Sequence, residues 1–364
     1  MDISTTDFLS IGPSGSRRVK FWGDTLSEKK YAHQVLNYQQ VINNDFPAIT
    51  KPTVLRITSP GENFDLKKEF LVLGGYPEAK DFVFKKGLIY PNTCWYQGWQ
   101  LVLEKVKHFV AQNPLIETMN TPETIQLAFH KLKCQQHLIE QNIQTPKIIL
   151  EQVIDYESLV QLLIQKNIHQ VFIKPYHSSS ASGIMAFRQA AGKQVLYTTI
   201  DLKKDGLYNN LKIQRYTDVS QIKKIINNMQ PSGLHVEEWI RKKTFQQKSV
   251  DFRILVINNK AVFVVPRMSQ HFITNLHLGN EKGNILSIEK TWGQTIIEQA
   301  KTLAVDATKA MKGLFYAGVD VAIAAKGQAY VLEVNAFGDL LLNIEKGNLN
   351  TYQYELKEWK SRFL

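Results

Sequence analysis

The sequence contains few cysteines and no long apolar run, and each scarcity excludes a class of protein. Only Cys94 and Cys134 are present among 364 residues, and their spacing matches no metal-binding motif. So few cysteines argue against a disulfide-rich secreted protein and favour a reducing compartment, the cytoplasm. No apolar run approaches the roughly 20 residues that a membrane-spanning helix needs. Residues 1–12 lack a basic stretch followed by an apolar one, so we expect neither a secretory signal nor membrane association.

Two common phosphate-binding signatures are also missing. The chain contains neither a GxGxxG dinucleotide-binding motif nor a GxxxxGKS/T P-loop. The segment Gly12–Gly15 follows a short apolar strand and precedes a helical stretch that begins near Arg17. We interpret it as an ordinary strand-to-helix turn at the start of an α/β domain. Anion binding by this loop is the alternative interpretation.

The composition is that of an ordinary globular protein, with 44% hydrophobic and 21% charged residues. The length allows two or three domains. A formal charge of +11 favours an anionic partner such as a nucleotide or a phosphorylated metabolite, although a solubility charge explains it equally well. The basic residues are dispersed, and the densest patch, residues 242–248, is too short to indicate nucleic-acid binding.

The most informative stretch is residues 317–342, which reads as two apolar strands around a Lys326-Gly327 turn. That turn sets Asp320 opposite Glu333, and Asn335 shares the face of Glu333. Facing carboxylates repel each other unless one is protonated or a cation lies between them. The three side chains therefore form an oxygen-donor set suited to Mg²⁺ or Mn²⁺. The alternative is two unrelated acids on a solvated strand, and a one-residue slip would separate them.

Other polar residues lie where elements end. A helix predicted to start at Pro122 and to continue past residue 130 carries Lys131, and an apolar strand at 170–174 ends in Lys174. The small residues 178–183 follow, and such a loop can approach phosphate oxygens closely. Surface lysines and a flexible linker are the simpler interpretations of these features. A further loop, after a strand at 52–57, offers acceptor-substrate candidates, namely Arg56, Ser59 and Glu62.

Taken in order, these motifs resemble the ATP-grasp superfamily, and most closely the branch of glutathione synthetase and the RimK-type glutamate ligases. The resemblance rests on residues 130–146, on VFIKP ending at Pro175 and on VEEWI ending at Ile240, and it spans residues 118–343. VEEWI resembles the hinge that holds adenine in the family, and Asp251 with Arg253 resembles its D-x-R pair. It implies an α/β ATP-grasp fold in which two α+β subdomains, one of them a lid at about 147–240, grip ATP. An N-terminal α/β domain (1–117) with acceptor contacts would precede it, and a C-terminal tail or helix (344–364) would follow. The pattern also suggests a little-characterised bacterial branch.

The resemblance also implies the site residues. Those expected to bind ATP are Lys131, Lys174, Ser179, Ser180, Ser182, Gly183, Glu237, Glu238, Trp239, Ile240 and Asp251. Those expected to face the transferred phosphoryl group are Arg253, Arg267 and Asn275. The expected metal ligands are Asp320, Glu333 and Asn335. The family often continues with S-x-P-G after the asparagine, whereas this chain has AFGDLL, so Phe337 is expected to border the acceptor substrate.

The implied activity is that of an ATP-dependent ligase that joins a carboxylate to an amine or thiol through an acyl phosphate, with Mg²⁺ or Mn²⁺. The carboxylate would belong to a small molecule or a peptide, and a homodimer is compatible with the resemblance. One alternative is an ATP-grasp kinase that phosphorylates a hydroxyl of an anionic substrate. The other is a nucleotide-binding regulator without catalysis.

Overall fold

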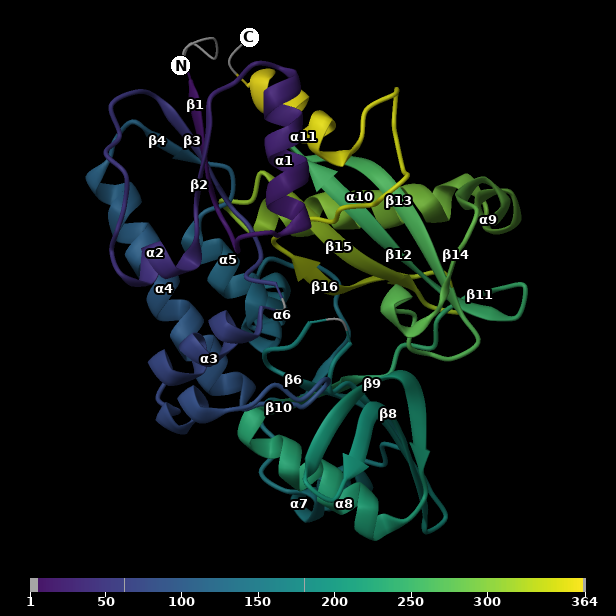
Figure 1. The fold of residues 1–364 in the computed structure, drawn as a ribbon. Coiled ribbons are helices and arrows are strands. Elements are labelled where there is room, and N and C mark those ends of the chain that lie inside the picture. Colours follow the sequence, from purple (N-terminus) through teal and green to yellow (C-terminus); the bar gives the residue numbers. More distant parts are fainter. Residues whose placement is uncertain (1–5, 62, 180, 363–364) are drawn as a thin grey trace.

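The fold is built around three β-sheets, which the computed structural model describes over residues 6–61, 63–179 and 181–362 (Figure 1). The N-terminal sheet is parallel with the order β2-β1-β3-β4. Its strands are β1 (Asp7–Ile11), β2 (His33–Leu36), β3 (Thr53–Ile57) and β4 (Ile116–Thr118). The helices packed around it are α1 (Arg17–Glu28), α2 (Tyr38–Ile42), α3 (Phe64–Leu73), the 3-10 turn η2 (Pro77–Asp81) and α4 (Asn92–Gln112).

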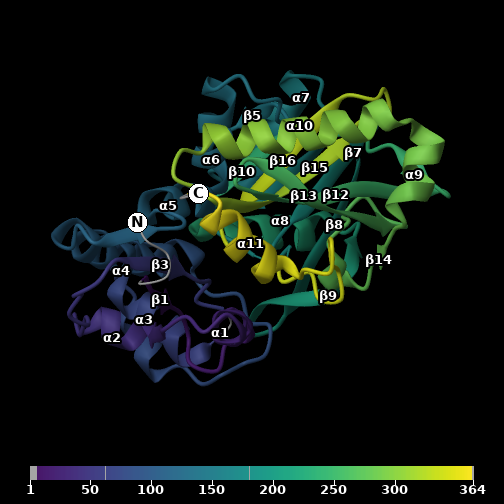
Figure 2. The ribbon, with the colours of Figure 1, turned by 90° about the horizontal axis from the view of Figure 1, so that it is seen from above.

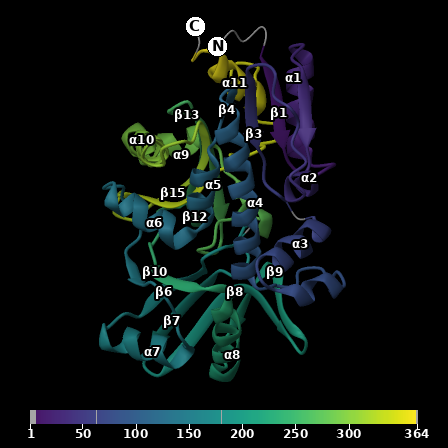
Figure 3. The ribbon, with the colours of Figure 1, turned by 90° about the vertical axis from the view of Figure 1, so that its left-hand side faces the viewer.

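The second sheet is antiparallel with the order β5-β10-β6-β7-β8-β9. Its strands are β5 (Ile148–Leu150), β6 (Gln170–Pro175), β7 (Met185–Ala190), β8 (Lys193–Lys203), β9 (Gly206–Tyr216) and β10 (Leu234–Glu238). Its helical segments are α7 (Tyr156–Gln165), α8 (Val219–Met229) and η3 (Gln230–Ser232). Figure 3 shows α7 and α8 on the side of this sheet that faces away from the rest of the molecule, which leaves the opposite side to meet the third sheet.

The third sheet has the order β14-β13-β12-β15-β16, and β11 pairs with β12. Its strands are β11 (Thr244–Phe245), β12 (Lys248–Ile257), β13 (Lys260–Ser269), β14 (Glu281–Lys282), β15 (Tyr316–Ile323) and β16 (Ala329–Asn335). The associated helices are α5 (Pro122–Phe129), α6 (Lys131–Glu140), η4 (Leu276–Leu278), α9 (Ile285–Trp292), α10 (Gln294–Ala310) and α11 (Thr351–Lys360). Helix α10 lies across one face of this sheet (Figure 2). Part of the opposite face packs against α11, and the rest lines the site described below.

One sequence prediction about the helices is wrong, because one predicted helix is in fact two. The periodic pattern predicts a helix that runs from Pro122 through Lys131, but the chain breaks at His130 into α5 and α6. The His130 ring accepts a hydrogen bond from the Lys133 amide at 3.3 Å and so caps α6. A side-chain cap satisfies a backbone donor that a new helix start leaves open. Lys131 is consequently the first residue of α6.

The described residues contain no helix that is long and apolar enough to cross a bilayer. The main core lies under the third sheet, against α10, and continues without interruption into the N-terminal sheet through α4. A separate core fills the second sheet and its two helices.

Candidate active site

A cavity of about 590 Å³ lies where the three sheets meet, and it contains most of the predicted site residues. Its walls include the residues expected to bind the phosphates and the metal, namely Lys131, Lys174, Asp251, Arg253, Arg267, Asn275, Asp320, Glu333 and Asn335. The hinge and loop predictions that also line it are Ser179, Glu237, Glu238 and Ile240. Of the predicted acceptor residues, Ser59 and Phe337 line it as well. Segments far apart in the sequence therefore converge on one volume.

The two acids of the hairpin face each other as predicted. Asp320 on β15 pairs directly with Glu333 on β16. Each already has a basic partner. Arg253 binds Asp320 through two nitrogens, with the longer contact at 3.2 Å, and the Lys131 ammonium contacts Glu333. The expectation that a bound cation must separate the acids needs correction, because side chains of the protein itself neutralise both.

Asp320 is held in its charged form. Burial alone would raise the pKa of this carboxyl group, but the guanidinium groups of Arg253 and Arg267 outweigh burial and lower it. The second of these contacts joins Arg267 Nη2 to an Asp320 oxygen at 3.1 Å. A carboxylate that stays ionised in a buried site is the form that binds a divalent cation.

The third predicted ligand, Asn335, has its amide nitrogen committed to the protein. Its Nδ2 donates to the Gly318 carbonyl at 3.1 Å, which leaves the amide oxygen as its acceptor. Within the described residues no group of three or more His, Cys, Asp or Glu side chains is arranged to hold a metal ion. Mg²⁺ in nucleotide-binding sites usually needs only one or two carboxylates, because phosphate oxygens and water complete its shell. The donor set fits such a metal.

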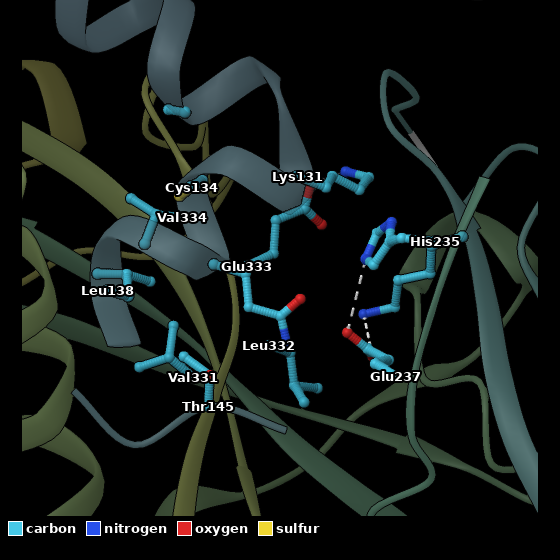
Figure 4. A pocket seen from close by; sticks show the side chains of 13 residues that line it. Lys131, Cys134, Leu138, Thr145, His235, Glu237, Val331, Leu332, Glu333 and Val334 are labelled. Carbon is cyan, nitrogen blue, oxygen red and sulfur yellow. Dashed lines mark hydrogen bonds and ion pairs between the residues drawn. The ribbon is translucent and has the colours of Figure 1, made fainter. Parts of the chain in front are cut away.

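The part of the cavity that contains Lys131 and Lys174 pairs each lysine with a glutamate. Lys174 on β6 contacts Glu237 on the neighbouring strand β10. Figure 4 shows a smaller pocket that shares Lys131, Glu237 and Glu333 with this cavity. In it, Glu237 and His235 lie on one side, and Lys131 and Glu333 lie on the other. Burial raises the pKa of Glu237, although Lys174 opposes the rise. Burial also lowers the pKa of His235 to about 3, so this imidazole is neutral near pH 7.

A buried network fixes the strand that carries the predicted D-x-R pair. Asp251 accepts hydrogen bonds from Arg267 Nε at 2.7 Å, from Lys242 Nζ at 2.8 Å and from the Thr274 hydroxyl. Lys242 also donates to Thr274 at 2.6 Å. The pKa of Asp251 is lowered, because Arg267 and Lys242 together outweigh the effect of its burial. The network ties the loop that carries Asn275 to the third sheet.

Sequence reasoning missed Lys242, because it belongs to the basic patch 242–248 that reads as surface charge. Its side chain is only 8% exposed and lines the cavity. The one sequence signal is its position, two residues after the predicted hinge ends at Ile240. Position alone does not reveal burial.

Four predicted residues have other partners. Arg56 is only 1% exposed and is paired with Glu355 on α11, which argues against the predicted acceptor contact. Trp239 packs on Phe172 and Phe272 in an apolar cluster and is not among the residues that line the cavity. The others belong to the loop after β6, where they shape the backbone: they are Ser182, whose amide donates to the Ser179 carbonyl at 2.9 Å, and Gly183.

Gly183 is favoured by its backbone conformation. It has a φ of +73°, which side chains with a Cβ atom rarely adopt. Two further predicted residues, Ser180 and Glu62, lie outside the described residues.

The cavity extends beyond the predicted site to the N-terminal sheet. There it is lined by Arg17 and Arg18 at the start of α1 and by Asp339 in the loop after β16. Arg18 Nη1 donates to the Phe337 carbonyl at 2.7 Å, and Arg253 Nη1 donates to Asp339 at 2.8 Å. Three sequence features pointed to this end, namely the unusual AFGDLL segment, the Gly12–Gly15 turn and the loop that carries Ser59. None of them singled out the two arginines.

Comparisons with known proteins agree with this geometry. Residues 121–339 match the YheC/D-like ATP-grasp family. The chain is 27% identical over 237 residues to coenzyme gamma-F420-2:alpha-L-glutamate ligase of Methanocaldococcus jannaschii, a match that covers 63% of this chain and 67% of the relative. The ligase of the same name from Methanococcus maripaludis is 26% identical over 240 residues, which cover 65% and 67%.

Solved ATP-grasp structures share the fold over nearly the whole chain. The ATP-grasp ligase PsnB with its minimal precursor is 12% identical, with a TM-score of 0.57 and 99% of both chains covered. D-cycloserine synthetase DcsG is 9% identical, with a TM-score of 0.56 and coverage of 98% of this chain and 100% of that chain. D-alanine–D-alanine ligase from Bacillus anthracis, complexed with ATP, is 13% identical, with a TM-score of 0.51 and coverage of 99% and 92%.

The predicted α/β ATP-grasp fold is therefore confirmed, and the comparisons support the prediction of an ATP-dependent ligase. The nearer likeness to the glutathione synthetase and RimK branch stays a prediction, as does a bacterial subfamily. Because the family match spans more than half of the sequence, the chain belongs to the YheC/D-like ATP-grasp family.

Proposed function

We propose that the protein is an ATP-dependent ligase that activates a substrate carboxylate as an acyl phosphate and joins it to an amine. A thiol acceptor is the less favoured version of the same chemistry. The observation that carries the proposal is the convergence of Asp320, Glu333 and Asn335 with four basic side chains on one cavity. Those basic side chains are Lys131, Lys174, Arg253 and Arg267. The ligase names of the matched relatives support the reaction type.

ATP would bind along the seam between the second and third sheets. Lys174 and Lys131 are proposed to contact its phosphates, and the hinge residues Glu238 and Ile240 its base. All four line the cavity. In the present structure Lys131 and Glu333 neutralise each other. With a metal bound, Glu333 would be one of its ligands and the Lys131 ammonium would contact a phosphate oxygen, so neither charge would lack a partner.

Asp320, Glu333 and Asn335 would hold Mg²⁺, or Mn²⁺, through their oxygen atoms. A divalent ion there neutralises the charge that develops as the phosphoryl group moves. The contribution of the protein is a set of fixed positive charges around the reacting oxygens. Arg253 and Arg267 are held by carboxylates on both sides, so they stabilise that charge with little reorganisation.

The proposed reaction has two steps, a phosphoryl transfer followed by an acyl transfer. A carboxylate oxygen of the substrate attacks the γ-phosphorus of ATP, and ADP leaves with the electron pair of the broken bond. The amine then attacks the acyl carbon, a C–N bond forms, and the C–O bond breaks as inorganic phosphate departs. The nitrogen loses a proton to the departing phosphate. We propose that Asn275, which lines the cavity, faces the transferred phosphoryl group together with the two arginines.

Hydroxylamine trapping tests this proposal. The protein is incubated with Mg-ATP, hydroxylamine and a panel of carboxylic acids. We expect at least one acid to give a hydroxamate in a one-to-one ratio with ADP. Glu333→Gln serves as the inactive control. ADP formation that depends on a hydroxyl substrate and yields no hydroxamate would establish the kinase alternative instead.

The proposal also includes a division of the chain into parts. We assign residues 1–117 to substrate contacts, residues 118–343 to the ATP-grasp unit with its lid at about 147–240, and residues 344–364 to a C-terminal segment. Cys94 and Cys134 are both free thiols, which supports a reducing compartment and hence the cytoplasm. A homodimer and the absence of nucleic-acid binding remain predictions.

A further inference from the structure

The strand order of the N-terminal sheet creates a crevice where ligands commonly bind. From β1 the chain places β2 on one side and β3 on the other, so the order reverses between β1 and β3. In open parallel sheets, ligands lie outside the carboxyl ends of the strands at such a switch point. The loops that follow these two strands both reach the cavity. They contribute Arg17 and Arg18 after β1, and Ser59 and Gly61 after β3.

The positive charges at this end differ from those around the proposed nucleotide site in whether a carboxylate of the protein pairs with them. There, Lys131, Lys174 and Lys242 each contact a carboxylate. Neither Arg17 nor Arg18 forms an ion pair with a carboxylate within residues 6–61, 63–179 and 181–362. Arg17 is exposed to solvent at the cavity wall. A pair of guanidinium groups without an internal acid is suited to binding an anionic group of a ligand.

One carboxylate accompanies these arginines. Asp339 lines the same end of the cavity, is 32% exposed, and is held by Arg253 at 2.8 Å. It follows Phe337, whose carbonyl oxygen binds Arg18 at 2.7 Å, by only two residues. Two residues of chain span at most about 7 Å. A positive and a negative group are thus held on one short turn, beside an arginine of the proposed phosphoryl site.

We propose that Arg17, Arg18, Ser59 and Asp339 form the acceptor subsite, and that its ligand is a free α-amino acid. The inference rests on the proposed ligase function and names the class of its nucleophile. The arginines bind the carboxylate of the amino acid, and Asp339 binds its ammonium group. Because Asp339 repels a carboxylate, the subsite selects the nucleophile and not the acyl donor.

Asp339 also has a role in the transfer itself. The bound ammonium group gives one proton to Asp339 and becomes an amine. The amine attacks the acyl carbon and forms the C–N bond. The bond between that carbon and the oxygen that bridges to phosphorus then breaks. Phosphate leaves with that electron pair, and the second proton of the nitrogen passes to it. Arg253 keeps Asp339 next to the reacting atoms throughout.

Titration calorimetry tests the subsite directly. The protein is saturated with Mg²⁺ and the non-hydrolysable analogue AMPPNP, and is titrated with the proteinogenic L-amino acids and D-alanine. Each ligand is paired with its N-acetyl and carboxamide derivatives, and a matching dipeptide is included. We expect at least one free amino acid to bind, and blocking either charge to weaken binding by about tenfold or more.

The variants assign each charge to a side chain. Arg17→Ala should weaken binding of the free amino acid while leaving its carboxamide unaffected, and Arg17→Lys should restore part of the loss. Asp339→Asn should weaken the free form but not the N-acetyl form. Lys20→Ala is the matched control, because Lys20 is an exposed cation of the same helix that pairs with Asp24.

The subsite is wrong if no free amino acid binds more tightly than its blocked forms, or if Arg17→Ala leaves binding unchanged. Preferential binding of the dipeptide would replace the free amino acid with a peptide end as ligand. The AMPPNP affinity of the same samples separates this result from the proposed function. Tight nucleotide binding without amino-acid binding overturns the subsite alone, whereas absent nucleotide binding overturns the ligase.

Discussion

Asp320 and Glu333 face each other although the turn between their strands is not the one that the sequence predicts. A turn at Lys326-Gly327 would pair Ala325 with Gln328, but the last pair of the ladder is Ile323 with Ala329. That register is shifted by one residue, which by itself would place the acids on opposite faces. A bulge between Val331 and Glu333 inserts Leu332 and restores the pairing. The acids therefore face each other because the bulge at Leu332 compensates for the one-residue shift at the turn.

This relationship predicts that Glu333→Gln abolishes ATP turnover and preserves the fold. An amide accepts hydrogen bonds but lacks the charge that holds a divalent ion between phosphates. We expect ADP release to fall by about a hundredfold or more, with an unchanged circular dichroism spectrum. Glu298→Gln, on the exposed side of α10, is the matched control and should behave as wild type. Turnover near the wild-type rate in Glu333→Gln would remove the metal assignment.

The contact between Lys174 and Glu237 predicts losses of ATP affinity and of stability that a second substitution can separate. Lys174→Met should weaken ATP binding by about tenfold or more, because a phosphate loses its cation. It should also destabilise the protein by about 3–5 kcal/mol, because Glu237 is then buried without its partner. Adding Glu237→Gln should recover most of the stability but not the affinity. Calorimetric ATP titration and urea unfolding measure the two quantities, and unchanged affinity in Lys174→Met contradicts the assignment.

Lys242 is predicted to position the loop after β13, which carries Thr274 and Asn275. Replacing it by methionine removes the bonds to Asp251 and Thr274, so the loop that carries Asn275 loses its anchor. We expect the kcat for ADP release to fall by about ten- to a hundredfold, with a smaller change in the KM for ATP. Lys248→Met, in the same basic patch but paired with the exposed Glu281, should leave both constants unchanged. Equal effects of the two substitutions would mean that the patch acts only through charge.

How much the sequence reveals depends on the range of the interactions. The period-two pattern of one strand places Glu333 and Asn335 on one face, because their spacing is local. The pairing of Asp320 with Glu333 also needs the bulge at Leu332, which the pattern does not signal. Burial is not local. Arg18 meets the Phe337 carbonyl across 319 positions of sequence, and no nearby residue signals that contact. The break at His130 was also missed, because the apolar stripe continues through it while a side-chain cap starts a new helix.

The Arg56–Glu355 pair yields a prediction that separates structure from substrate binding. Arg56 lies over the rings of Trp22, Tyr316 and Tyr352, and it joins β3 to α11 across 299 positions. Arg56→Met leaves a buried carboxylate unpaired and should destabilise the protein by about 3–5 kcal/mol. The KM values for all substrates should remain as in the wild type at temperatures where the variant is folded.

The control for this prediction removes both charges. Arg56→Met with Glu355→Leu replaces a buried ion pair by apolar groups of similar volume, and such replacements are often neutral or stabilising. The double variant should therefore unfold near the wild-type urea concentration. If Arg56→Met instead raised one substrate KM about tenfold and left the unfolding midpoint unchanged, the arginine would contact substrate as the sequence suggests. Burial at 1% exposure argues for the structural outcome, because a substrate cannot reach a guanidinium that α11 covers.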